Sequence, residues 1–251
     1  MVPFDVVNVF DLLFLGVLFV VQPWFGRRSW LRLRRAIAAG VTPDRVRLYV
    51  QTMAAQWAGF AVLLAAWWWL DRPLADLGVH GDLGTGFVVV AVLGTLALGA
   101  LGILAWRSRR ASAEQKLAAR EQLGDLLPFL PQDDRDLRTF FALSVTAGVV
   151  EELLYRGFAL WALAQWMPLW AAVALSSVAF GLAHSYQGMG GMLRTGAMGL
   201  LFAVLFLASG SIWLPMLFHA IFDVLQGVQI RELFRKREVG SVPEPGETAE
   251  A

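Results

Sequence analysis

The sequence contains no cysteine, which excludes disulfide bridges, thiolate metal sites and cysteine nucleophiles. Charged residues are also scarce, at 16% of the chain against about 25% in soluble domains, while 57% of the residues are hydrophobic. Lysine is almost missing, since only Lys116 and Lys236 occur. The formal net charge is +1, and the charges are gathered in short segments rather than spread over one face. We therefore expect no nucleic-acid partner. This composition indicates that lipid is the main solvent of the folded chain.

The sequence contains several long apolar runs. A helix needs about 20 mostly apolar residues to cross a hydrocarbon core of roughly 30 Å. Seven stretches meet or approach this length: 6–25, 49–70, 86–106, 137–163, 169–186, 192–208 and 212–230. Because lipid cannot satisfy open backbone polar groups, the stretches predict an all-α, polytopic transmembrane helix bundle with seven spans.

Residues 1–237 are therefore predicted to form a single transmembrane helical domain. Residues 117–131 mix charges with apolar residues, which predicts an amphipathic surface helix or a re-entrant piece that would raise the count to eight spans. Residues 238–251, rich in acids and containing Pro243 and Pro245, predict a disordered cytoplasmic tail.

The distribution of arginine predicts the orientation in the membrane. Residues 26–48, read as a loop, and residues 107–136 are rich in arginine, whereas residues 71–85 contain only Arg72 among three aspartates. Basic residues concentrate on the cytoplasmic side, so the N-terminus is expected outside and the C-terminus in the cytoplasm. No basic residue precedes the first apolar run, so we expect a retained span rather than a cleaved leader.

Three charged residues interrupt the fourth span, in the string EELLYRG. Each costs about 2.5–3.5 kcal/mol at the bilayer centre, so Glu151, Glu152 and Arg156 should face the interior of the bundle. Glu152 and Arg156 are four residues apart and can pair on one helix face. Glu151 is rotated by about 100° from Glu152 and should remain free for reaction. The alternative is that all three only hold helices together.

Two of the three histidines also lie in spans. His184 follows Phe180 by four residues in FGLAH, and His219 precedes Asp223 by four residues in HAIFD. By counting residues, Glu151 and His219 reach similar depths, whereas His184 lies about 10 Å nearer the cytoplasmic edge. A single intramembrane histidine more often holds helices together, but two of them with a free glutamate favour a catalytic site.

The three motifs EExxxRG, FxxxH and HxxxD, in this order, resemble the CAAX prenyl endopeptidase family and its bacterial relatives, the CPBP (Abi) intramembrane proteases. The resemblance covers residues 151–223 within a family-like core at 137–230, and it implies a protein of the prokaryotic inner membrane. It implies a glutamate-activated water, with Glu151 as base, His184 positioning the water, and His219 and Asp223 on the oxyanion side. Glu152, Arg156 and Phe180 would support this site. Eukaryotic prenyl-protein members carry Asn where this chain has Asp223, and the family plan has eight spans.

Other functions remain open at this point. Glu151, His184 and His219 could instead bind a catalytic zinc ion, as a possible divalent-metal cofactor, although no HExxH helix is present. A non-catalytic membrane scaffold, an immunity protein or a transporter could use the same charges. The expected partners are the lipid bilayer and a peptide or lipidated membrane-protein substrate, and the sequence does not indicate which substrate.

Overall fold

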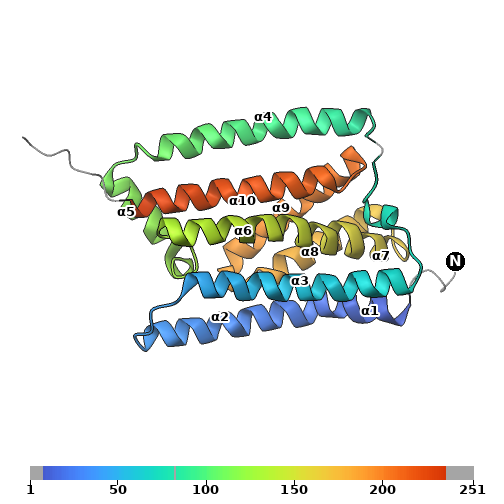
Figure 1. The fold of residues 1–251 in the computed structure, drawn as a ribbon, viewed down its shortest axis with the longest axis horizontal. Helices are drawn as coiled ribbons and strands as arrows, with labels where there is room; N and C mark the ends of the chain where they lie inside the picture. Colours follow the sequence, from blue (N-terminus) through green and yellow to red (C-terminus); the bar gives the residue numbers. More distant parts are fainter. Residues whose placement is uncertain (1–7, 82, 236–251) are drawn as a thin grey trace, which may run out of the picture.

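A computed structural model describes residues 8–81 and 83–235. Every regular element in these residues is helical, which confirms the all-α helix bundle (Figure 1). The predicted tail at 238–251 and the first residues of the predicted span 6–25 lie outside the described residues.

The first span belongs to one helical stretch made of α1 (Val9–Gly16), the π-helical η1 (Val17–Val21) and α2 (Gln22–Ala38). Asn8 caps its start in a capping box with Asp11. The reading of residues 26–48 as a loop was wrong, because the helix continues to Ala38. Arginine favours helix, and the first break is Gly40, whose φ of 87° suits glycine best.

Three further helices complete the first half of the chain: α3 (Arg45–Trp69), α4 (Thr85–Ser108) and α5 (Ala113–Leu123). The short 3₁₀ turns η2 (Leu74–Leu77) and η3 (Gly124–Leu126) follow α3 and α5. In Figure 1 α5 lies at one end of the bundle, beside the last turns of α10, and does not enter between the long helices. This placement fits the surface-helix reading of residues 117–131, although the helix itself ends at Leu123.

The second half contains the fourth stretch, α6 (Asp134–Glu152), the π-helical η4 (Leu153–Ala159) and α7 (Leu160–Ala164). It continues with α8 (Leu169–Ala183), the 3₁₀ turn η5 (Ser185–Gln187), α9 (Gly188–Ser209) and α10 (Trp213–Phe234). The described residues thus contain long helical stretches at all seven predicted positions. Within them, four helices are long and apolar enough to cross a membrane by length and composition, at 9–38, 45–69, 85–107 and 185–209. The number of crossings therefore remains a prediction.

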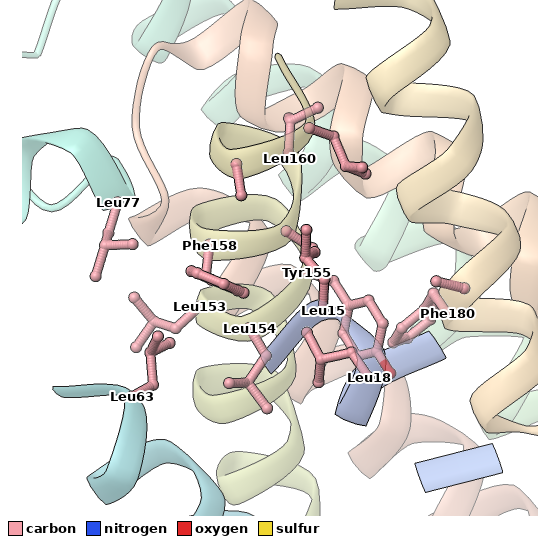
Figure 2. Close-up of a cluster of buried hydrophobic side chains, with 14 of the residues drawn as sticks. Leu15, Leu18, Leu63, Leu77, Leu153, Leu154, Tyr155, Phe158, Leu160 and Phe180 are labelled. Atoms are coloured by element: carbon pink, nitrogen blue, oxygen red, sulfur yellow. The ribbon is translucent and has the colours of Figure 1, made fainter. Parts of the chain in front are cut away.

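The fourth stretch is the centre of the bundle, where α6 packs against α3 and α10. Gly148 permits the close approach of α10, since a Cβ atom there would lie 2.7 Å from the Met216 carbonyl oxygen. Buried apolar side chains surround η4, with Leu63 and Leu77 on one side and Leu15 and Leu18 on another (Figure 2). This packing fixes the helix that carries the three charged residues of the EELLYRG string.

One buried ion pair ties the first helix to the segment after α3. Asp11 is fully buried and accepts two hydrogen bonds of 2.7 Å from the guanidinium group of Arg72. The same guanidinium group lies over the rings of Trp67 and Trp161. The pair stabilises the end of the bundle opposite the arginine-rich segments.

Candidate active site

Glu152 and Arg156 form a buried ion pair in the centre of the fourth stretch. Their exposed fractions are 0% and 1%, and Arg156 Nη1 donates to Glu152 Oε1 at 2.8 Å. Arg156 also donates from Nη2 to the carbonyl oxygen of Gly199 on α9, at 3.0 Å. Its guanidinium group lies 4.3 Å from the centroid of the Phe180 ring. Arg156 thereby connects three of the helices around the site.

A π-helical turn begins directly after Glu152 and contains Arg156. Such wider turns are frequent at functional sites because they reorient side chains within a helix. Ser176 on α8 donates its hydroxyl hydrogen to the Tyr155 carbonyl oxygen at 2.8 Å, so a neighbouring helix satisfies part of the altered backbone. Periodicity based on a regular α-helix could not predict this turn.

The imidazole ring of His219 on α10 lies close to three carboxylates, those of Glu151, Glu152 and Asp223. Its Nδ1 atom lies 2.7 Å from Glu152 Oε1, and its Nε2 atom lies 4.0 Å from Glu151 Oε2 and 3.6 Å from Asp223 Oδ2. The ring stacks on Phe202, with centroids 5.0 Å apart. Since an ionised carboxylate only accepts hydrogen bonds, Nδ1 is the donor to Glu152, and Nε2 faces Glu151 and Asp223.

The contacts of the two glutamates differ in one respect from those predicted from their spacing along a single helix. Glu152 was expected to pair only with Arg156, and Glu151 was expected to point to another side of the helix. Both glutamates reach His219, because the imidazole lies between them and presents a different nitrogen to each. Glu152 therefore orients the imidazole as well as pairing with arginine.

Gln56 on α3 is a site residue that the sequence reasoning missed. Its Nε2 atom donates to Glu151 Oε1 at 2.7 Å, which holds one oxygen of that carboxylate and leaves Oε2 toward His219. Its polar side chain within the apolar run 49–70 was the available signal, because polar side chains in spans usually bond to another helix. The resemblance to a family covers only residues 151–223, so it could not indicate Gln56.

His184 directly follows α8 and lies beside Phe180 rather than against the glutamates. Its Nδ1 atom lies 2.9 Å from the Phe180 carbonyl oxygen, so Nδ1 is the donor and Nε2 of the neutral ring can accept a hydrogen bond. The Phe180 ring centroid is 4.9 Å from that of His184 and 6.0 Å from that of His219. Phe180 thus separates the two imidazoles while placing both in one neighbourhood.

Exposure increases from the ion pair toward Asp223. The side chain of Glu152 is completely buried, those of His219 and Glu151 are 7% and 11% exposed, and that of Asp223 is 27% exposed. Asp223 lies one helical turn from His219 toward the end of α10 at Phe234. The site therefore opens toward the end of the bundle that carries α5 and the arginine-rich part of α2 (Figure 1).

The zinc alternative depends on the arrangement of Glu151, His184 and His219. Within residues 8–81 and 83–235, no group of three or more His, Asp or Glu side chains has a geometry that could hold a metal ion. Glu151, His184 and His219 do not form such a group, and we derive no step through a metal.

Comparison with known proteins finds a family that matches part of the chain. The family described as Rce1-like, type II CAAX prenyl endopeptidase, matches residues 134–225. This segment runs from the first turn of α6 into α10 and contains all the site residues predicted from the motifs. No curated protein and no solved structure matches. Residues 134–225 are thus similar to the Rce1-like family of type II CAAX prenyl endopeptidases, which agrees with the resemblance seen in the motifs.

Proposed function

We propose that this protein is an intramembrane endopeptidase that hydrolyses a peptide bond of a membrane-associated substrate with a water activated by Glu151. The family supports a CAAX-type membrane protease in general. The observation that carries the finer proposal is the contact between Glu151 on α6 and His219 on α10, 4.0 Å apart in a largely buried site.

Hydrolysis needs a base for the water and donors for the oxyanion that develops on the substrate. Glu151 Oε2 is the base, because Gln56 occupies the other oxygen of the carboxylate. The free Nε2 atom of His184 accepts a hydrogen bond from the water and orients it. His219, protonated on both ring nitrogens, donates from Nδ1 to Glu152 and from Nε2 to the oxyanion, and Asp223 orients the imidazole. The proton taken by Glu151 then passes to the departing amine, which restores the carboxylate.

The supporting residues keep this geometry fixed. Glu152 accepts from His219 Nδ1 while it pairs with Arg156, and Phe180 packs between the two histidines. Substrate enters from the Asp223 side, which in the proposed orientation faces the cytoplasmic leaflet of a prokaryotic inner membrane, with the N-terminus outside. The substrate is a peptide segment or a lipidated membrane protein.

The proposal is tested by comparing membrane proteins exposed to the wild-type protein and to Glu151→Gln. Vesicles containing each form are mixed with a membrane fraction, and new peptide termini are identified by mass spectrometry. We expect termini that appear only with the wild-type protein. The absence of any such terminus would favour a scaffold, immunity or transport role for the same charges.

Removal of metal ions separates the glutamate mechanism from the zinc alternative. We expect cleavage to continue at the wild-type rate after exhaustive chelation, because the proposed base and oxyanion donors are side chains. Metal content is measured by mass spectrometry on the same sample. Loss of cleavage on chelation and its recovery with Zn²⁺ alone would contradict the proposed mechanism.

A further inference from the structure

A second feature with binding chemistry lies on the outer face of α2, away from the active site. A hollow of about 580 Å³ is lined there by exposed side chains of a single helix face. Its lining residues are Trp24, Arg27, Arg28, Leu31, Arg32 and Arg35.

The four arginines of this hollow have no anionic partner in the described part of the chain. Arg28 lies over the Trp24 ring at 5.1 Å, and none of the four forms an ion pair with a carboxylate in residues 8–81 or 83–235. Four guanidinium groups on one face repel one another. Such an arrangement is stabilised by an anion that lies between them.

The position of the hollow along the helix identifies the source of the anion. The helical stretch 9–38 has 30 residues and is therefore about 45 Å long, against a hydrocarbon core of roughly 30 Å. The same face is apolar before the arginines, with Val20, Val21 and Trp24 exposed by 66%, 51% and 58%. The change from apolar to basic at an exposed tryptophan marks the boundary between acyl chains and headgroups.

We propose that the face formed by Trp24, Arg27, Arg28, Leu31, Arg32 and Arg35 binds the headgroup of an anionic phospholipid. Guanidinium groups bind phosphate oxygens in pairs, and clusters of arginine next to a membrane span attract anionic lipids. The acyl chains of the lipid lie along Val20 and Val21.

The opposite face of α2 connects this lipid site to the active site. Trp30 is buried and lies 5.8 Å from the ring of Tyr186, which in turn lies 5.8 Å from the ring of His184. Gly26 faces the end of α8, because a Cβ atom there would lie at an ordinary contact distance, 3.7 Å, from the Ala183 carbonyl oxygen. The helix that carries the lipid site thus packs against α8 and η5, the segments on either side of His184.

The test replaces the four arginines with glutamine and measures lipid retention. Purified protein in detergent is given an equimolar mixture of phosphatidylglycerol and phosphatidylcholine, and bound lipid is counted by native mass spectrometry. We expect the wild-type protein to retain phosphatidylglycerol preferentially, and the α2 variant to lose this preference by about 10-fold or more. The matched control changes four exposed arginines at the same end of the bundle, Arg47, Arg107, Arg110 and Arg135, and should keep the preference.

Three outcomes would overturn the proposal. The first is equal retention of phosphatidylglycerol by the wild-type protein and the α2 variant, with both folded by circular dichroism. The second is an equal loss in the control variant, which would mean that total charge decides retention. Millimolar glycerol phosphate should not displace the lipid, and displacement would assign the site to a free phosphate compound instead. Because binding is measured without proteolysis, its failure is distinct from failure of the proposed protease function.

Discussion

Glu151→Gln is expected to lower the rate of peptide cleavage by about 10²–10⁴-fold, the usual contribution of a general base. The substitution removes the basic oxygen but keeps the size of the side chain and the hydrogen bond from Gln56. It also leaves the ion pair of Glu152 and Arg156 in place. The measurement is the initial cleavage rate of one identified substrate in vesicles, with protein amount and thermal unfolding recorded for each form.

The matched control is Glu121→Gln on α5, which removes an exposed carboxylate distant from the α6 pair. It should cleave at the wild-type rate. If the Glu151→Gln protein were as active as this control, Glu151 would not be the base, even if other site residues proved essential.

Arg156→Met is expected to reduce the free energy of unfolding by about 3–5 kcal/mol, as when one partner of a buried ion pair is removed. The change leaves the Glu152 carboxylate without a guanidinium partner at a fully buried position. One oxygen of that carboxylate, Oε2, already makes no hydrogen bond within the described residues. The contact with the Gly199 carbonyl oxygen is lost as well.

Denaturant unfolding in detergent micelles measures this effect. The double variant Glu152→Gln with Arg156→Met should recover part of the loss, because no unpaired charge remains buried. The control Arg138→Met removes an exposed arginine from the same helix and should change stability little. An Arg156→Met protein as stable as Arg138→Met would show that the pair does not hold the bundle together.

The positions of the long helices could be predicted from the sequence because apolar length is a property of each segment alone. The seven predicted stretches coincide with helical stretches, and the site residues in the family motifs lie in α6, η4, α8 and α10 or, for His184, directly after α8. The helix end at Ala38 was missed because charge was used to mark a loop. Arginine ends a membrane span but does not end a helix.

Contacts between helices could not be predicted in the same way. The hydrogen bond from Gln56 to Glu151 joins residues 95 positions apart, and the bond from His219 to Glu152 joins residues 67 positions apart. Spacing along one helix separated the two glutamates correctly by angle but could not show that an imidazole lies between them. The buried pair of Asp11 and Arg72 depends likewise on how two distant segments pack.

The proposed mechanism requires Glu151 and His219 to act together on one substrate, and a double-mutant cycle measures this most directly. Cleavage rates are compared for the wild-type protein, Glu151→Gln, His219→Gln and the double variant. Residues that act as a unit are strongly non-additive, so the double variant should be only as slow as the slower single variant. Losses that multiply, so that the double variant is slower by the product of both factors, would show that the two side chains work independently and would contradict a shared catalytic site.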